Sequence, residues 1–302
     1  MASSERQGGI LLPSVNGKTR LLGVFGYPVE HSLSPAMHNA AIAALGLNYL
    51  YIPFSVLPED IGPAIRSIVA LGIIGVNLTI PHKECVLPFL DSISPEAEAI
   101  GAVNTVHNDN GRLVGYNTDG EGFAGPLRAM GFSFAGKRAV VWGAGGASRS
   151  VVFRLAQEEA SVTLVNRTRE RAERIAQDVA SSIPGSQVST LDINDVSELT
   201  DAVSRAELLV NTTSVGMSPH VAEMPQVPLE AFHPGLFVYD LIYNPFETRL
   251  LAAARDKGCQ VLNGAGMLAY QGAAAFEKWT GVYPDVHIME NVVSRQLSDV
   301  RS

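Results

Sequence analysis

Two ionisable side chains that lie far apart in the chain, Lys83 and Asp119, could act together as an acid–base pair. Reduction of a carbonyl group needs a proton donor within hydrogen-bond reach of the oxygen. A carboxylate beside a lysine keeps the amine charged and positioned, and the amine keeps the carboxylate ionised. Each residue also has an ordinary explanation, because lysines are mostly exposed and an acid in the first turn of a helix is stabilised by the helix dipole. Only their combination points to chemistry.

Both residues belong to polar clusters that follow predicted strands. The clusters are residues 26–35, 77–83, 101–105 and 115–119. Open α/β sheets bind ligands at the carboxyl ends of their strands, so the four clusters are expected to form one polar site. In the first cluster, Ser32 and Ser34 flank Leu33, and both hydroxyls project from one side of an extended segment at a helix start, which suits a carboxylate. N-capping of the helix by Ser34 is the alternative.

A strand followed by closely spaced glycines indicates a dinucleotide-binding turn. The strand Arg138–Trp142 runs into Gly143, Gly145 and Gly146, where backbone N–H groups at a helix start can approach a pyrophosphate. Ser148 occupies the third small-residue position of this glycine pattern and is small enough for close helix–strand packing. Residues 146–150 also come close to the nucleophile elbow of acyl hydrolases, but the final glycine of that pattern is missing and no acid–histidine pair can be assigned.

The end of the next predicted strand, residues 162–165, indicates which nucleotide would bind. NAD-specific sites usually place an acidic residue there for the ribose 2′-OH, and this chain has Asn166, Arg167 and Thr168 instead. Arg167 and Arg171 could bind the additional phosphate of NADP, with a hydrogen bond from Thr168. The alternative is that these arginines belong to a solvated helix face rich in Arg and Glu. The pattern favours NADP.

Alternating strand-like and helical segments predict an α/β fold. The expected strands are 21–25, 49–54, 73–78, 103–107, 113–116, Arg138–Trp142, 162–165, 207–210, 236–241 and Gln260–Leu262. Helices are expected to begin at Pro35 and Pro58, and a capping-box spacing between Thr118 and Glu121 predicts a third helix start. The second series of strands should form a parallel sheet, because helical crossovers return the chain to the same edge. The last helix, from Gly266, is expected to pack on the first domain.

Composition excludes several classes of protein. Of the 302 residues, 46% are hydrophobic and 17% charged, which is typical of a globular chain of about two domains. Lys plus Arg is 22 and Asp plus Glu is 30, so a net charge of −8 offers no basic surface for nucleic acid. No apolar run is long enough to span a bilayer, so no membrane partner is expected.

The cysteines and histidines suggest a reduced chain without a metal. Cys85 and Cys259 form no CxxC pattern, which is typical of a cytoplasmic protein. His31, His38 and His82 lack a third ligand at metal-binding spacing. We therefore expect a cytoplasmic protein whose histidines are structural or exposed to solvent.

The motifs, taken in order, make the chain similar to shikimate dehydrogenases, NADP-dependent enzymes that reduce 3-dehydroshikimate to shikimate. The similarity extends from about residue 21 to about residue 297. It is carried by GYPVEHSLSPAMHN, NLTIPHK, GAVNT, GYNTDGEG, GAGGASR, NRT, NTTSVGM, DLIYNP and GAGMLAYQ. The resemblance implies an oxidoreductase of aromatic amino acid biosynthesis with a small-molecule substrate, and we expect a monomer or homodimer.

The resemblance also assigns roles residue by residue, with Lys83 and Asp119 as the catalytic pair. The residues implied to bind substrate are Ser32, Ser34, Thr79, Lys83, Asn104, Asp119, Tyr243 and Gln271, with Ser32, Ser34 and Tyr243 around the substrate carboxylate. The residues implied to bind NADP are Gly143, Gly145, Gly146 and Ala147 at the pyrophosphate, Asn166, Arg167, Thr168 and Arg171 at the 2′-phosphate, and Met217, Gly264 and Met267 beside the nicotinamide. Arg149 is expected either to contact a phosphate or to lie on the helix surface.

The family's fold implies an N-terminal α/β substrate-binding domain, completed by the C-terminal helix, and a Rossmann-type NADP-binding domain. The expected division is a flexible tail (residues 1–19), the substrate-binding domain (20–118), the Rossmann domain (119–263) and a C-terminal helical segment that packs on the substrate domain (264–302).

The implied reaction is hydride transfer from NADPH to the C3 ketone, while Lys83, oriented by Asp119, stabilises the oxyanion and supplies the proton. Two alternatives remain. A quinate/shikimate dehydrogenase often uses NAD, and Arg167 in place of an acid and Ser34 in place of a bulkier hydroxyl residue argue against it. A dinucleotide-sensing protein could keep the fold without the reaction, but it would not need Lys83 and Asp119.

Overall fold

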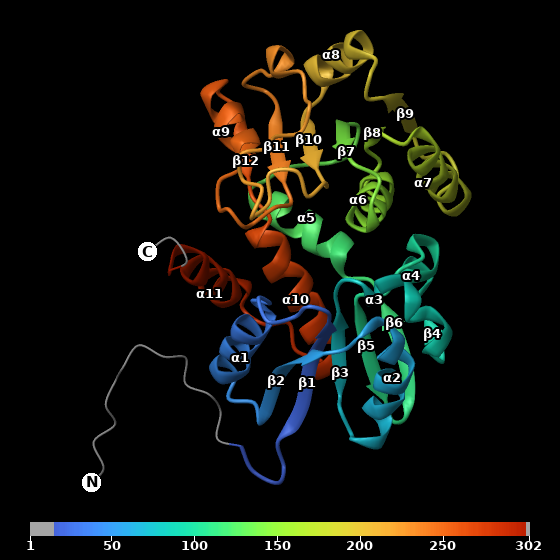
Figure 1. Cartoon of the computed structure of the whole chain (residues 1–302), viewed down its shortest axis with the longest axis vertical. Helices are drawn as coiled ribbons and strands as arrows, with labels where there is room; N and C mark the ends of the chain where they lie inside the picture. The colour runs from blue at the N-terminus through green and yellow to red at the C-terminus, as the bar shows by residue number, and fades with distance from the viewer. Residues whose placement is uncertain (1–14, 300–302) are drawn as a thin grey trace. The chain divides into compact units, whose positions relative to one another are not determined.

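Two six-stranded sheets are formed by residues 15–299, the part of the chain that the computed structural model describes (Figure 1). The chain separates into two units, each with one sheet. Unit 1 comprises residues 15–94, Val103–Tyr116 and Gly272–Gln296. Unit 2 comprises Pro95–Ala102, Asn117–Gln271 and residues 297–299.

The sheet of unit 1 is mixed. Its strands, in spatial order, are β2 (Tyr49–Ser55), β1 (Arg20–Gly26), β3 (Gly75–Leu78), β5 (Thr105–Asp109), β6 (Arg112–Tyr116) and β4 (Ser92–Ile93). β1 pairs parallel with β2 and β3, whereas β5 runs antiparallel to β3 and β6. Leu22, Val24 and Phe25 are at most 2% exposed, which accounts for the apolar run of β1. Because β5 is antiparallel to β3, the start of β5 lies at the edge where β1 and β3 end.

The helices of unit 1 pack on this sheet and are joined to its strands by loops. They are α1 (Ser34–Ala44), α2 (Ile61–Ala70), α3 (His82–Cys85), most of α11 (Val286–Asp299) and the second half of α10 (Ala265–Thr280), with short 3-10 turns at Pro58–Asp60 and Leu87–Phe89. Pro35 and Pro58 lie in first turns, as predicted. The Trp279 indole N–H of α10 donates to the Val106 carbonyl oxygen at 2.9 Å, so the end of α10 packs against β5.

The sheet of unit 2 is entirely parallel. Its strands, in spatial order, are β12 (Gln260–Leu262), β11 (Phe237–Asp240), β10 (Leu208–Asn211), β7 (Arg138–Trp142), β8 (Ser161–Asn166) and β9 (Val188–Asp192). Counted from β7, this is the strand order 3-2-1-4-5-6 of dinucleotide-binding folds, whose ligand crevice lies where the order reverses. That point is between β7 and β10. The predicted α/β class with a Rossmann-type sheet is confirmed.

Apolar layers cover both faces of the parallel sheet. One layer joins it to α5 (Asp119–Ala129), α6 (Gly146–Gln157) and α7 (Arg169–Ser182). The other joins it to α8 (Val196–Arg205), α9 (Arg249–Asp256) and a 3-10 turn at Leu229–Ala231. Burial on both faces explains why β7 and β10 are continuous apolar runs in the sequence. Within residues 15–299, no helix combines the length and apolar character that crossing a lipid bilayer requires.

Two segments group with unit 2 although the expected domain limits place them with the substrate-binding domain: residues 95–102 and residues 264–271. Helix α4 (Pro95–Ile100) falls within 20–118, the stretch assigned to the substrate-binding domain, yet it groups with unit 2 and contacts α6 and α7. Ile100 and Ala102 are buried in the apolar core of unit 2, Arg149 Nε of α6 donates to the Ile100 carbonyl oxygen at 2.7 Å, and Arg154 pairs with Glu96 at 3.2 Å.

The expected tail is only partly within the described residues, because residues 1–14 lie outside them. Residues 15–19 are held by side-chain hydrogen bonds. Thr19 Oγ1 donates to Asn48 Oδ1 at 2.8 Å, and Asn48 Nδ2 donates to Asn16 Oδ1 at 3.2 Å. This short stretch is therefore part of unit 1.

Candidate active site

The serines of unit 1 follow β1 directly. Helix α1 begins at Ser34, so Ser34 is a first-turn residue and Leu33 occupies the N-cap position. The predicted alternative of N-capping by Ser34 is therefore wrong. Ser32 Oγ accepts a hydrogen bond from the Ser34 backbone N–H at 3.3 Å. The two residues are thus held side by side at the end of β1.

Thr79 and Lys83 follow β3, the neighbour of β1. The Thr79 backbone N–H donates to the Phe25 carbonyl oxygen at 3.0 Å, which fixes the chain beside the end of β1. Lys83 lies half-buried in the single turn of α3. Its carbonyl oxygen accepts from the Val103 N–H at 2.8 Å, which brings residues 103–105 alongside α3.

Asn104 precedes β5 and is almost completely buried. Its backbone N–H donates to the Tyr116 carbonyl oxygen at 3.0 Å, and its carbonyl oxygen accepts from the Leu78 N–H at 2.8 Å. Its side-chain Oδ1 accepts from Thr105 Oγ1 at 2.9 Å. Ser32, Ser34, Thr79, Lys83 and Asn104 therefore all lie at one edge of the unit 1 sheet.

A buried network behind this edge was not predicted. Tyr51 OH donates to Asn77 Oδ1 at 2.8 Å, and Asn77 Nδ2 donates to Thr105 Oγ1 at 3.2 Å. The His38 ring stacks on Tyr51 with centroids 4.2 Å apart, and burial lowers the pKa of His38 to about 3, so the imidazole is neutral. Asn77 was visible in the motif NLTIPHK, but its partner Tyr51 could be found only from the pairing of strands.

The turn after β7 in unit 2 is open to solvent. Gly143 has φ +107°, and a Cβ there would lie 2.7 Å from Thr212 Oγ1. At Gly145 and Gly146 a Cβ would meet nothing within 4 Å, and α6 begins at Gly146. Ala147 follows in the first turn. A ligand can therefore approach the backbone at the start of α6, as pyrophosphate does in dinucleotide-binding turns.

The structure shows why a serine, Ser148, can occupy the third small-residue position of the glycine pattern. The side chain is fully buried, and its Oγ donates to the Gly143 carbonyl oxygen at 2.7 Å, so the hydroxyl closes the turn. A nucleophile must be exposed to its substrate. The acyl-hydrolase alternative therefore has no support at this serine.

The residues expected at the 2′-phosphate surround the end of β8. Asn166 Oδ1 accepts from the Ala144 N–H at 3.2 Å and ties this strand end to the glycine turn. Arg167, Thr168 and Arg171 are exposed, and neither arginine forms an ion pair with any residue between 15 and 299. Arg169 does pair with Glu173, at 2.8 Å. The solvated-face interpretation therefore describes Arg169, whereas Arg167 and Arg171 remain available to an anion.

Arg149 forms polar contacts with two other elements of unit 2. It does not lie free on the surface of α6, because Nη2 pairs with Asp178 of α7 at 2.6 Å while Nε donates to Ile100. Its Nε and Nη2 groups are thus used by α4 and α7. Arg149 therefore fastens α4 to α6 and α7.

The residues implied beside the nicotinamide follow β10 and β12, and Tyr243, implied to bind the substrate carboxylate, follows β11. Met217 is 45% exposed, Met267 is half-buried, and a Cβ on Gly264 would overlap the Leu241 carbonyl oxygen. Tyr243 is half-buried, and burial raises the pKa of its phenol above the usual value, so it stays neutral. All four lie in unit 2.

Asp119 and Gln271 also belong to unit 2, on two helices that cross closely. Asp119 opens α5 and is 5% exposed, and Gln271 lies on α10. The helices can approach because Gly122 has no side chain: a Cβ there would lie 2.6 Å from Gln271 Cβ. Asp119 and Lys83 fall in different units, so their pairing stays a prediction.

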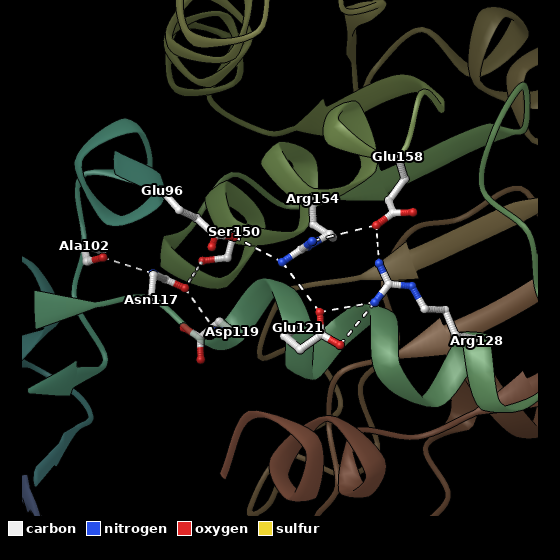
Figure 2. Close-up of polar contacts among 9 residues, drawn as sticks. All are labelled: Glu96, Ala102, Asn117, Asp119, Glu121, Arg128, Ser150, Arg154 and Glu158. Atoms are coloured by element: carbon white, nitrogen blue, oxygen red, sulfur yellow. Dashed lines mark hydrogen bonds and ion pairs between the residues drawn. The ribbon is translucent and has the colours of Figure 1, made fainter. Parts of the chain in front are cut away.

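Asn117 holds the start of α5, as Figure 2 shows. Its Oδ1 accepts from the Asp119 backbone N–H at 3.0 Å and from Ser150 Oγ of α6 at 3.3 Å. Its Nδ2 donates to the Ala102 carbonyl oxygen at 3.0 Å. The helix start predicted from Thr118 and Glu121 is confirmed, because α5 begins at Asp119 with Thr118 as N-cap, but Thr118 forms no side-chain capping hydrogen bond and Asn117 supplies the acceptor instead.

Glu121 instead joins a charged network that links three helices (Figure 2). Arg154 of α6, only 16% exposed, approaches Glu96 of α4 at 3.2 Å, Glu121 of α5 at 3.7 Å and Glu158, the C-cap of α6, at 3.7 Å. Arg128 of α5 also pairs with Glu121, at 3.1 Å, and with Glu158. Together with Asn117, this network fixes Asp119 relative to helix α6.

Three family models match the chain. The shikimate dehydrogenase substrate binding domain matches residues 24–106, shikimate/quinate 5-dehydrogenase matches residues 127–226, and the shikimate 5′-dehydrogenase C-terminal domain matches residues 264–293. A shikimate dehydrogenase (NADP(+)) from Moorella thermoacetica is 50% identical over 282 residues, which cover 92% of this chain and 94% of the relative. The chain belongs to the shikimate dehydrogenase family.

Solved shikimate dehydrogenases share this fold. The enzyme from Listeria monocytogenes, in complex with shikimate and NAD, is 36% identical with a TM-score of 0.89, covering 93% of this chain and 98% of that chain. The enzyme from Thermus thermophilus, in complex with NADP(H) and shikimate, is 40% identical with a TM-score of 0.82, covering 91% and 99%. The resemblance inferred from the motifs is confirmed.

Replacing Asn117 by alanine should destabilise unit 2 of this shikimate dehydrogenase by about 1–3 kcal/mol, because the Asp119 N–H and the Ala102 carbonyl oxygen lose a buried partner. Urea unfolding followed by tryptophan fluorescence measures the change. Asn194→Ala, in an exposed loop, is the control. Equal stability of both variants and the parent would show that Asn117 does not anchor α5.

Proposed function

We propose that this chain is an NADP-dependent shikimate dehydrogenase, which reversibly reduces the C3 ketone of 3-dehydroshikimate to give shikimate on the route to chorismate and the aromatic amino acids. The observation that carries the proposal is family membership over 92% of the chain, with the substrate-side and nucleotide-side motifs both intact. We propose a monomer or homodimer in the cytoplasm.

The residues of unit 2 fit NADP. Space is open at Gly145 and Gly146 for a pyrophosphate at the start of α6. Beyond β8, exposed Arg167 and Arg171 can form charge-assisted hydrogen bonds with a 2′-phosphate. The neutral Asn166 stands where a carboxylate would favour an unphosphorylated ribose. Met217, Gly264 and Met267 are proposed to line the nicotinamide side.

The residues of unit 1 fit a small polyhydroxylated acid. Ser32 and Ser34 offer hydroxyls at a helix start, a place that favours a carboxylate, and Tyr243 is proposed to join them. Thr79 and Asn104, with Gln271 and Asp119, are proposed to contact ring hydroxyls. The proposed domains are those expected from the sequence: 20–118 binds substrate, 119–263 binds nucleotide, and 264–302 is a C-terminal helical segment that packs on the substrate-binding domain.

Bound NADPH supplies the hydride for this reaction. Lys83 is proposed to donate a hydrogen bond to the C3 oxygen, to stabilise the negative charge that develops there, and to supply the proton. Asp119 is proposed to keep the ammonium charged and oriented. Burial of Asp119 and the hydrogen bonds of Asn117 support this role, because a positioning carboxylate must itself be held still.

One assay of substrates and nucleotides separates the proposed function from the two alternatives, a quinate/shikimate dehydrogenase and a dinucleotide-sensing protein. The oxidation of NADPH and NADH is followed by absorbance with 3-dehydroshikimate, and the reduction of NADP⁺ and NAD⁺ with shikimate and quinate. The proposal predicts turnover of shikimate and 3-dehydroshikimate with strong preference for the phosphorylated nucleotides. Equal or better turnover of quinate with NAD⁺ would instead make the chain a quinate/shikimate dehydrogenase. Nucleotide binding without turnover of any substrate would make it a dinucleotide-sensing protein.

A further inference from the structure

A carboxyl group is buried at the end of β11 among neutral donors. Asp240 is fully buried. Its Oδ2 accepts from Thr248 Oγ1 at 2.7 Å, and its Oδ1 accepts from Asn211 Nδ2 at 3.0 Å and from the Ile242 N–H at 3.2 Å. A carboxylate in such a place is costly unless its hydrogen bonds are satisfied. An apolar side chain would fill this part of the core at a lower free-energy cost. The presence of a carboxyl group is therefore explained by the groups to which it forms hydrogen bonds.

Asn211, which forms a hydrogen bond with Asp240, also forms hydrogen bonds with the loop after β10. Its Oδ1 accepts from the Thr213 N–H at 3.1 Å and from Thr213 Oγ1 at 2.7 Å. Thr213 Oγ1 in turn accepts from the Val215 N–H at 3.3 Å. This chain of hydrogen bonds fixes the turn that leads to Met217.

The other two partners of Asp240 fix the loop after β11. The Ile242 N–H lies immediately before Tyr243, and the Ile242 carbonyl oxygen accepts from the Gly264 N–H at 3.0 Å. Thr248 closes the loop at its far end, where its Oγ1 also accepts from the Leu251 N–H at 3.3 Å as the N-cap of α9. One carboxyl group thus joins both ends of this loop to the loop after β10.

The glycine turn of the nucleotide site rests on the same loops. A Cβ on Gly143 would lie 2.7 Å from Thr212 Oγ1 and 2.8 Å from Thr213 Cγ2. Thr212 Oγ1 donates to the Trp142 carbonyl oxygen at 2.8 Å, so the loop after β10 lies against the end of β7. The loops held by Asp240 therefore flank the point of the sheet where the strand order reverses.

We propose that Asp240 is a positioning residue that holds the loops 212–217 and 241–248 in the arrangement that binds the nicotinamide end of NADP. This inference rests on the proposed function, because it takes unit 2 as the NADP-binding unit. It assigns no contact between Asp240 and the nucleotide. The carboxylate acts through Asn211, Ile242 and Thr248, and its effect is local to one end of the ligand.

Binding of two ligands tests whether the effect of Asp240 is limited to the nicotinamide end of the site. NADPH reaches both ends of the site, whereas adenosine 2′,5′-bisphosphate carries the 2′-phosphate and lacks the nicotinamide. Asp240→Asn keeps the shape and the Oδ1 acceptor but places an NH₂ group opposite Thr248 Oγ1. We expect the Kd for NADPH to rise about tenfold, the scale of one hydrogen bond to a charged group, with the Kd for adenosine 2′,5′-bisphosphate unchanged. Asp256→Asn, on the exposed end of α9, is the matched control and should change neither.

A pH series adds a second readout. Burial raises the pKa of Asp240 to about 6, and the groups that face its carboxyl are the neutral Asn211 amide, Thr248 hydroxyl and Ile242 N–H. Protonation below that pH removes acceptor capacity, so the parent protein should lose NADPH affinity relative to adenosine 2′,5′-bisphosphate as the pH falls through about 6. Taking the ratio of the two affinities cancels titration of the shared 2′-phosphate. Asp240→Asn should abolish this change.

The possible outcomes separate the inference from the proposed function. If the parent protein binds neither ligand, the proposed function fails before Asp240 is tested. If Asp240→Asn weakens both ligands equally, or neither, the positioning role is wrong. Should Asp240→Asn not fold, Thr248→Ala removes the Oδ2 donor, and Thr248→Ser, which restores a hydroxyl, should rescue NADPH affinity; failure of that rescue contradicts the inference.

Discussion

Lys83→Ala is expected to lower kcat for reduction of 3-dehydroshikimate by about 10²–10⁴-fold, the range in which a positioned proton donor contributes to a reaction. The Kd for NADPH should stay unchanged, because Lys83 lies in unit 1 and every proposed nucleotide contact lies in unit 2. A fall in kcat without a change in nucleotide affinity is the signature of an interaction made at the reacting atoms.

Steady-state kinetics and NADPH titration of the same preparation measure both quantities. Lys18→Ala is the matched control, since Lys18 is an exposed lysine of the same unit and should leave kcat as it is. Unchanged turnover in Lys83→Ala would remove this lysine from the mechanism, whatever happens to substrate affinity.

Arg167→Ala is expected to raise the Kd for NADPH by about 10–100-fold while the Kd for NADH stays the same. A hydrogen bond from a guanidinium to a phosphate is among the strongest single contacts a protein can make, and the 2′-phosphate is the only group by which the two nucleotides differ. Arg167 is exposed at the end of β8, and no ion pair within residues 15–299 competes for it.

The control for Arg167 lies two residues away. Arg169→Ala removes an equal charge from the same helix start, but Arg169 is paired with Glu173 and should have little effect on either nucleotide. Equal losses for NADPH in the two variants would show a general electrostatic effect and contradict a specific 2′-phosphate site. A loss for NADH as large as that for NADPH in Arg167→Ala would contradict it as well.

Much of the unit 2 sheet could be predicted from the sequence because both of its faces are covered. β7, in the middle of the sheet, has the bounds expected from its apolar run. β9 (Val188–Asp192) was missed because it is an edge strand of mostly half-buried residues that follows the loop-like stretch 181–187. A strand with little buried surface carries little apolar signal.

Local polar chemistry was harder to predict than strand positions. Thr118 and Asn117 are both good capping residues, and only the backbone geometry decided that Asn117 holds the start of α5. Arg149 lies next to the glycine turn in sequence, yet its side chain pairs with Asp178 of α7. The first case depends on backbone geometry and the second on a partner from another element, so spacing within one motif was insufficient.

Some residues of the candidate site could be predicted from sequence motifs, and others only from the structure. Residue types and motif order singled out Lys83, Ser32 and Asn104, and the structure places them at one edge of the unit 1 sheet. Asp240 stood in a recognised motif without a role, because its function depends on β10 and β11 being neighbours. Strand neighbours far apart in sequence are set by tertiary packing.

A double-mutant cycle on Lys83 and Asp119 tests most directly whether the two residues act as one acid–base pair. The parent protein, Lys83→Ala, Asp119→Asn and the double variant are compared by kcat for 3-dehydroshikimate reduction at saturating NADPH. If Asp119 acts by orienting and charging Lys83, the double variant will match Lys83→Ala within about twofold, because the carboxylate has nothing left to position. Losses that multiply, so that the double variant shows the product of the two single effects, would mean that the residues act independently and would contradict the proposed pair.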